Sequence, residues 1–430
     1  MPFVPVLKVE IDFASGPSFS YPLILDSAAY GILGTNILAD APSDLVDISD
    51  MVMACSTRRG RNRILTNFEA GSATVTLNDP DSDFNPQNAA GPYYGKLLPL
   101  RKIRIYSQIE VNSQIVEVDL FSGYITSYDT GFNTGVYNTS TVVLQCVDGF
   151  RLLNNVSTGV NPIPGATAGQ LSGARVDTIL DFAGFPTSMR TTDVGNSTMQ
   201  VDPGGARSVL AAIQTVEQSE FGAFFMQRDG KALFLDRNAV SQRADGTPRV
   251  YDDLGLPTAF SYTNVDFAFD DQLILNDVTV TALGLTAQTV TDQDSIDKYF
   301  TKAGARSDIL VQTNTEANDQ ARTLLAARKD ASLRIDSIDL NLYASVSAQN
   351  TLINLSSDIY NLIIVEKNMS GGSSIVRELF IQGVQHDVTP DSWTTKLLTA
   401  EPLIQAFILD SANQGILGNT VPQNTNTLSY

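Results

Sequence analysis

The chain has 430 residues, of which 43% are hydrophobic and 17% charged, and 47 acidic against 28 basic side chains give a net charge of −19. This length and apolar share predict a globular protein with several cores and argue against a disordered chain. A nucleic-acid reader needs a basic surface to displace counterions, so the acidic balance argues against sequence-specific nucleic-acid binding.

Targeting signals and membrane segments are not evident in the sequence. Cys55 and Cys146 are far apart, which favours folding in a reducing cytoplasm over a disulfide scaffold. Residues 1–10 lack a basic segment followed by an apolar one, so we expect no signal peptide. No stretch approaches the roughly 18 continuous apolar residues of a membrane span.

One short motif occurs near both ends of the chain. In the predicted N-terminal extension, residues 1–50, Ile24-Leu25-Asp26-Ser27-Ala28 precedes Gly31-Ile32-Leu33-Gly34. The predicted C-terminal extension, residues 401–430, repeats both parts at the same spacing, from Ile408 to Gly418. The motif is either a hook that packs on a larger surface or a strand and turn within its own domain. Its interface candidates are Leu25, Asp26, Leu409 and Asp410.

Residues 51–150 are predicted to form a first small β-barrel domain, with a sandwich as the alternative. Alternating apolar and polar residues predict strands, and no helical pattern separates them. Turn residues such as Asn78-Asp79-Pro80 and Asp129-Thr130-Gly131 stand between the strands. The predicted strands include 73–77, 102–106, 114–120 and 141–147.

Residues 151–254 are predicted to form an α+β module. Ser172 is the expected N-cap of a helix that ends before Gly184, and Asp202-Pro203 is expected to open a second helix. A β-hairpin should follow, because Asp229-Gly230 suits a tight turn between two apolar runs. Residues 255–400 return to strands and predict a second β-rich barrel domain with one helix, near 315–328.

The few chemically active residues argue against catalysis. His386 is the only histidine, so it would have to be the base of any serine or cysteine triad. It lies in a strand and is expected to be structural, which argues against most cell-wall hydrolases. Asp79, Asp81 and Asp83 alternate along a turn and are weak calcium candidates. The alternative is an acidic turn whose side chains bond the backbone. We expect no enzyme activity and no cofactor.

The one concentrated basic patch lies early in the chain. Against the acidic background it is expected to meet an acidic protein partner, and arginine and tyrosine are common interface anchors. A solvated loop is the alternative. We predict that alanine at Arg61 and Arg63 impairs assembly more than folding. The interface candidates are Arg58, Arg59, Arg61, Arg63, Tyr93 and Tyr94.

The segment from Gly60 to Ile105 resembles the minor tail and hub proteins of long-tailed bacteriophages. The resemblance rests on Gly60-Arg61-Asn62-Arg63, Phe84-Asn85-Pro86, Pro92-Tyr93-Tyr94-Gly95 and Pro99-Leu100-Arg101-Lys102-Ile103. Residues 220–237 and 384–395 are similar to the same family. The terminal motifs resemble short elements of phage tail and fibre proteins.

The resemblance implies a baseplate hub, in which one chain carries two similar β-barrels and α+β modules. Three chains would then present six barrels, so that a trimer with pseudo-sixfold symmetry closes a sixfold tail tube. The implied partners are sister chains, tail-tube or distal-tail proteins, and tip or fibre proteins, in a virion assembled in the host cytoplasm. The alternatives are a hexameric distal-tail adaptor ring and a receptor- or glycan-binding tip protein.

Overall fold

The structure is a computed structural model that describes residues 4–14, 16, 18, 19, 23, 31, 44–61, 67–132, 140–242, 248–255 and 259–401. The candidates Leu25, Asp26, Arg63, Leu409 and Asp410 lie outside these ranges. The described fold is mainly β, as the strand patterns predict, with a 14-stranded sheet, two 3-stranded sheets and several helices.

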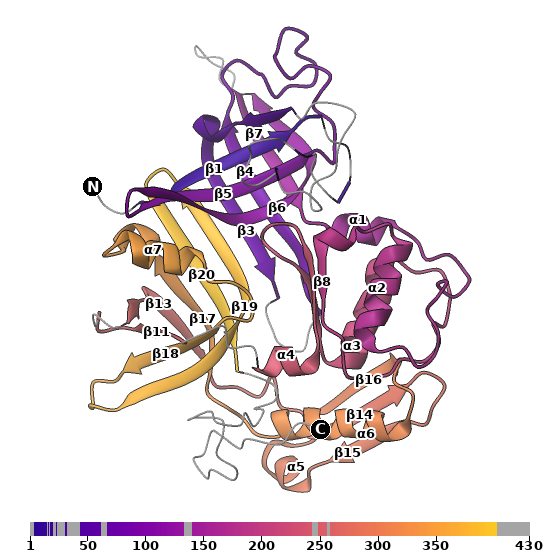
Figure 1. Cartoon of the computed structure of the whole chain (residues 1–430). Helices are drawn as coiled ribbons and strands as arrows, with labels where there is room; N and C mark the ends of the chain where they lie inside the picture. The colour runs from indigo at the N-terminus through magenta and orange to yellow at the C-terminus, as the bar shows by residue number, and fades with distance from the viewer. Residues whose placement is uncertain are drawn as a thin grey trace.

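The first β region occupies the top of Figure 1 and is antiparallel, in the order β3-β4-β7-β6-β5-β1-β2. Part of the predicted N-terminal extension belongs to it, because Val6–Asp12 pairs with Lys102–Gln108. Its elements are β1 (Val6–Asp12), β2 (Leu45–Asp47), η1 (Ser49–Met51), β3 (Val52–Gly60), β4 (Glu69–Asn78), β5 (Lys102–Val111), β6 (Gln114–Phe132) and β7 (Ser140–Val147).

The second β region is built around the long β19, which pairs with β18 and β20. β20 continues the sheet through β17 to β13, and β18 continues it through β11 to β12. Its elements are β11 (Arg249–Asp252), β12 (Phe260–Ser261), β13 (Asn264–Ala268), β17 (Arg334–Asn341), η3 (Leu342–Ala344), α7 (Ala348–Leu355), β18 (Leu362–Asn368), β19 (Ser374–Thr389) and β20 (Ser392–Ala400).

The two β regions form one continuous sheet, and none of the described sheets closes into a barrel. The edge of β3 that could close the first region is occupied, because Cys55–Gly60 pairs with Gly383–Val388 of β19. Apolar side chains of both regions also belong to one core, which includes Ile105, Phe121, Leu379 and Trp393. The prediction of two closed barrels is therefore wrong: the regions share a strand pairing and a core.

The middle module lies to the right in Figure 1 and packs α2 against α3 beside a small sheet. The predicted hairpin is confirmed, with Gly230 at a φ of +85° in its turn. Its elements are α1 (Phe150–Asn155), α2 (Ser172–Phe182), η2 (Thr187–Met189), β8 (Arg190–Thr192), α3 (Val209–Glu220), β9 (Ala223–Met226), β10 (Ala232–Leu235) and α4 (Arg237–Gln242).

Both predicted helix starts in this module are wrong. Ser172 is the first residue of α2 instead of its N-cap, and its hydroxyl donates to Glu220 at 2.8 Å. The second helix begins at Val209, where the Ser208 side chain accepts from the Ala211 amide. Asp202 instead accepts from the amide of Ile163. In both cases a long-range contact outweighs the local capping preference.

A small module interrupts the second β region between β13 and β17 and lies at the bottom of Figure 1. Its helix α6 covers the small sheet and begins with a capping box of Thr313 and Glu316. It has its own core, which includes Val278, Val280 and Leu324, so the predicted 255–400 block contains two packing units. Its elements are β14 (Asp277–Ala282), β15 (Gln288–Thr291), α5 (Gln293–Tyr299), β16 (Ala303–Ile309) and α6 (Asn314–Arg328).

Candidate functional site

The two β regions meet at a pair of glycines. β3 ends with Gly60 opposite Gly383 of β19, and Gly60 has a φ of +104°. A Cβ on Gly60 would lie 2.3 Å from the Gln382 carbonyl oxygen and 2.4 Å from the Gly383 Cα. Only glycine fits this positive φ and this close approach, so the junction depends on the residue type at position 60.

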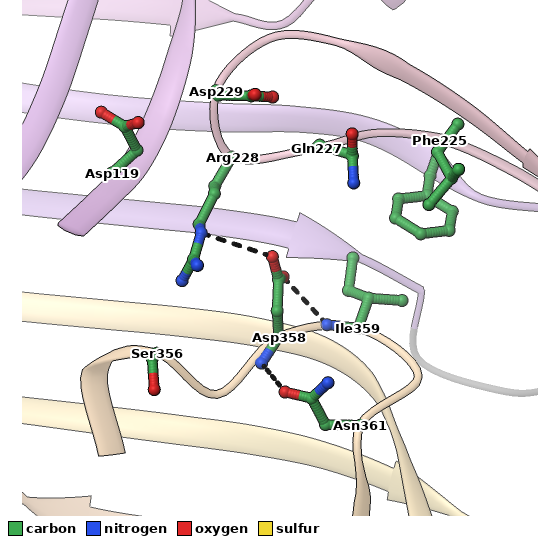
Figure 2. Close-up of a pocket in the computed structure, with 10 residues that line it drawn as sticks. Asp119, Phe225, Gln227, Arg228, Asp229, Ser356, Asp358, Ile359 and Asn361 are labelled. Atoms are coloured by element: carbon green, nitrogen blue, oxygen red, sulfur yellow. Dashed lines mark hydrogen bonds and ion pairs between the residues drawn. The ribbon is translucent and has the colours of Figure 1, made fainter. Parts of the chain in front are cut away.

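Arg59 crosses the junction as a buried cation. Its side chain is 5% exposed, its Nε donates to the Leu120 carbonyl at 3.0 Å, and its Nη2 donates to Asp358 Oδ1 at 2.7 Å. Asp358 Oδ2 also lies 3.8 Å from Nε of Arg228 (Figure 2). Burial acts to raise the pKa of Asp358, but the Arg59 and Arg228 charges outweigh it and hold that pKa below its usual value.

Arg61 makes a second connection between the two β regions. Its Nε donates to Gln382 Oε1 at 2.9 Å, and its Nη2 donates to the Tyr360 hydroxyl at 2.7 Å. Its guanidinium carbon lies 4.5 Å from the centre of the Phe68 ring. Since the side chain is 4% exposed, these contacts hold it inside the protein, where it joins β3 to the segment around β18 and β19.

A pocket of about 390 Å³ opens beside this junction. Figure 2 shows three segments around it: Asp119 from β6, the turn with Arg228 and Asp229 after β9, and the segment with Asp358 before β18. Its wall carries three carboxylates, from Asp119, Asp229 and Asp358, and one guanidinium, from Arg228, so the lining is acidic. This composition suits polar contacts between modules.

The basic patch predicted from the sequence is split by the alternation of β3. Arg58 is partly exposed and pairs with Glu69 at 3.4 Å, while Arg59 and Arg61 are buried in the junction. The expectation that all of them face a partner is therefore wrong for Arg59 and Arg61. The effect of alanine at both Arg61 and Arg63 stays a prediction, but the buried Arg61 side chain supports the chain's own fold, so its loss is expected to weaken folding as well.

The two candidate tyrosines differ in their surroundings. Tyr93 packs on the main core, with its ring 4.9 Å from that of Phe13 and 5.0 Å from that of Phe84. Tyr94, its neighbour, is 55% exposed. Of this pair, Tyr94 is the residue that is free to meet another protein, whereas Tyr93 stabilises the loop that carries it.

The acidic turn uses its first carboxylate internally. Asp79 is 1% exposed, and its two oxygens accept from the amides of Asp83, at 2.8 Å, and Phe84, at 3.0 Å. Burial and the nearby charges of Asp79 and Asp81 raise the pKa of Asp83. Among the described residues, no group of three or more His, Cys, Asp or Glu side chains is arranged to hold a metal ion. Calcium binding at Asp79, Asp81 and Asp83 stays a prediction.

His386 is part of the buried polar structure of β19. Its Nδ1 lies 2.8 Å from the Thr395 hydroxyl, and its ring meets the Trp393 ring edge-on. Burial, aided by the charge of Arg59, lowers the pKa of His386 to about 3, so the ring is neutral at physiological pH. Cys55 and Cys146 are also buried, and burial raises the pKa of both thiols. These groups fit a structural role.

Sequence reasoning missed the partners of the buried arginines. Asp358, Tyr360 and Gln382 stand in runs without a motif, and Asp358 is 299 residues from Arg59 in the chain. Gln382-Gly383 inside an apolar strand was the one available signal, because glycine there indicates a close backbone approach.

In the part of the chain that the structure describes, no helix has the length and apolarity needed to cross a bilayer.

No protein-family model matches the chain, and no curated protein sequence matches it. Among solved structures, a tail protein from Neisseria meningitidis MC58 is 13% identical with a TM-score of 0.54, covering 92% of this chain and 96% of that chain. The 43 kDa tail protein of prophage MuSo2 from Shewanella oneidensis is 12% identical with a TM-score of 0.52, covering 85% and 97%.

A chain of the lidless PdpA–VgrG complex is 11% identical with a TM-score of 0.50, covering 93% of this chain and 65% of that chain. Each of these likenesses covers at least 85% of the chain. The resemblance inferred from the sequence is confirmed at the level of architecture: the chain has the fold of phage tail proteins and of a chain of the PdpA–VgrG complex.

Proposed function

We propose that the chain is a structural component of a bacteriophage tail tip or baseplate, a hub that closes the tail tube and connects it to tip or fibre proteins. The observation that carries this proposal is the fold match along most of the chain to a tail protein from Neisseria meningitidis and to a prophage tail protein, each covered almost completely. The buried, internally paired arginines and the neutral His386 support a structural role without catalysis.

A homotrimer is the assembly that this architecture favours. The two β regions lie side by side in one chain through the β3–β19 pairing. Three chains would present six such regions, so a threefold hub could meet a sixfold tube through nearly equivalent contacts. With a net charge of −19, we expect the channel-facing surface to be acidic or neutral, which would keep passing DNA from adhering.

The partners proposed are sister chains, the tail-tube or distal-tail protein above the hub, and tip or fibre proteins below it. Tyr94 and Arg58 remain candidate contacts, because both keep exposed surface. The repeated Leu-Asp-Ser motifs, with Leu25, Asp26, Leu409 and Asp410, are proposed as further contacts. The proposed location is the virion tail tip, after assembly in the host cytoplasm.

Native mass spectrometry of the purified full chain, followed by gold labelling of virions, tests this function. The proposal predicts a trimer in solution and label confined to the tail tip. A hexamer would favour the distal-tail adaptor ring. A monomer that binds host glycan and decorates fibres would favour the receptor-binding alternative. A peptidoglycan zymogram should stay uncleared, and clearing by the purified chain would overturn the non-enzymatic role.

A further inference from the structure

In the described part of the chain, the two most exposed aromatic side chains lie at the base of the small module. Phe269 follows β13 and is 70% exposed, and Phe300 follows α5 and is 82% exposed. The Lys302 ammonium pairs with the Asp271 carboxylate, and each of these two residues stands two positions from one of the phenylalanines. The two phenylalanines therefore flank one ion pair, and we call these four residues the module-base surface.

Phe300 is presented by a strained backbone. Its φ of +62° and ψ of 168° fall in a region that residues with a side chain rarely occupy. The buried Asn276 side chain fixes this conformation, because its nitrogen donates to the Phe300 carbonyl at 2.9 Å and its oxygen accepts from the Lys302 amide at 2.7 Å. Strain of this kind is concentrated at binding sites, so a strained and exposed phenylalanine points to an interaction at this surface.

The last described residue, Glu401, lies at the same end of the second β region. Ala268, the residue before Phe269, pairs with Arg334 of β17. Continuing the register of β17 and β20 places Glu401 opposite Arg334 on its other side. Two strand spacings separate Ala268 from Glu401, which is about 10 Å. Residues 402–430, which lie outside the described ranges, therefore start beside the module-base surface.

Glu401 is held at this point by charges from three elements. Its Oε1 lies 3.5 Å from Nε of Arg377 on β19. Burial raises the pKa of its carboxyl group, and the charges of Arg377, Arg328 and Arg334 oppose that rise. Arg328 ends α6 of the small module, whereas Arg334 begins β17. The start of the C-terminal segment is thus attracted to both the small module and the second β region.

The residues that follow Glu401 form an apolar run. From Leu403 to Leu409 the sequence is Leu-Ile-Gln-Ala-Phe-Ile-Leu, in which the glutamine is the only polar residue. An extended chain spans up to about 3.5 Å per residue, so Phe407 can reach about 20 Å from Glu401. The run is near enough and apolar enough to cover the module-base surface, which removes apolar area of both from water.

We propose that the module-base surface is the docking site of the chain's own C-terminal segment, in which the run Leu403–Leu409 packs on Phe269 and Phe300. Glu401 anchors the start of the segment, and the docked run joins the small module to the end of the second β region. Asp410 and the residues after it stay available for the contacts with tail proteins proposed above.

Cross-linking of the full chain tests which segment reaches this surface. Phe300→Cys is combined with Leu409→Cys, or with Leu25→Cys at the equivalent position of the N-terminal motif, and each variant is treated with a short bismaleimide. Cys55 and Cys146 are buried and do not compete. Mass spectrometry should find a link from position 300 to 409 and none to 25. In an equal mixture of ordinary and nitrogen-15 chains, both linked peptides should come from the same chain.

Three results of this experiment would overturn the proposal. They are the absence of a link to position 409, an equally frequent link to position 25, and linked peptides that come from two different chains. The last result would assign the surface to a sister chain instead.

Hydrogen–deuterium exchange measures the same contact without cysteine variants. In the full wild-type chain, amides of residues 403–409 should exchange about 10-fold or more slower than unprotected amides, because one buried aromatic ring contributes that much to a local equilibrium. Phe300→Gly should remove this protection but keep that of β14 and α6, since glycine adopts the positive φ without strain. Phe132→Ala, at another exposed aromatic position, on β6, is the matched control and should leave residues 403–409 protected. Unprotected 403–409 amides in the wild type, or unchanged protection in Phe300→Gly, would refute the docking.

Discussion

Replacing Arg59 by methionine removes the buried cation between the β regions while keeping most of the apolar stem. Asp358 then loses a charged hydrogen bond of 2.7 Å and keeps only Arg228, at 3.8 Å, as an ionic partner. The Leu120 carbonyl loses its Arg59 donor as well. A charged hydrogen bond contributes about 1.5–3 kcal/mol and a neutral one about 1 kcal/mol, so we expect the free energy of unfolding to fall by about 3 kcal/mol.

Urea unfolding followed by tryptophan fluorescence measures this loss close to the junction. Trp393 is the only tryptophan, is fully buried, and lies on β20, which pairs with β19. Circular dichroism recorded in parallel shows whether the rest of the chain unfolds together with the surroundings of Trp393. A multidomain protein can instead unfold in separate steps.

Arg58→Met is the matched control, since Arg58 precedes Arg59 on the same strand. Its pair with Glu69 is 3.4 Å long, and the two side chains are 39% and 58% exposed, so we expect a change below about 1 kcal/mol. Equal losses for the two variants would refute the reasoning, because burial and pairing would then not distinguish them. Asp358→Asn in the Arg59→Met background should cost little more, since the two residues form one unit.

Three further predictions concern single positions. Gly60→Ala should lower the free energy of unfolding by more than about 2 kcal/mol in the same urea assay, because the added Cβ would collide with the backbone of Gln382 and Gly383. Gly95→Ala is the control and should cost about 1 kcal/mol, because no atom lies within 4 Å of the added Cβ. Glu217→Gln should raise the free energy of unfolding by about 3 kcal/mol above pH 7 and change it very little near pH 4. The reason is that burial raises the pKa of Glu217 to about 7, which destabilises only the ionised form. Thermal unfolding measured across this pH range checks the difference. Tyr93→Ala should lower the midpoint of unfolding, as it removes two ring contacts from the core, while Tyr94→Ala should leave unfolding unchanged and weaken association in sedimentation experiments.

Local patterns predicted the elements whose signals are complete within a few residues. Asp229-Gly230 forms the hairpin turn, because glycine supplies the positive φ that the turn needs. The helix expected near 315–328 is present as Asn314–Arg328, with Leu324 buried. In both cases neighbouring residues determine the local conformation.

Long-range contacts explain most of the predictions that were wrong. Arg59 and Arg61 looked like an exposed patch in sequence, because their partners stand about 300 residues away in the chain. Closed barrels were expected for the two β regions, yet the edge of β3 pairs with β19 instead. No local signal reveals that pairing except Gly60 and Gly383, whose role becomes clear only when the two strands lie side by side.

A symmetry-resolved reconstruction of the virion tail tip tests the central claim most directly. The account predicts three copies of this fold around the tail axis, with six β regions in a closed ring beneath the tail tube. The first and second β regions should alternate around that ring. Density for six copies in a ring, or absence of the chain from tailed particles, would contradict it.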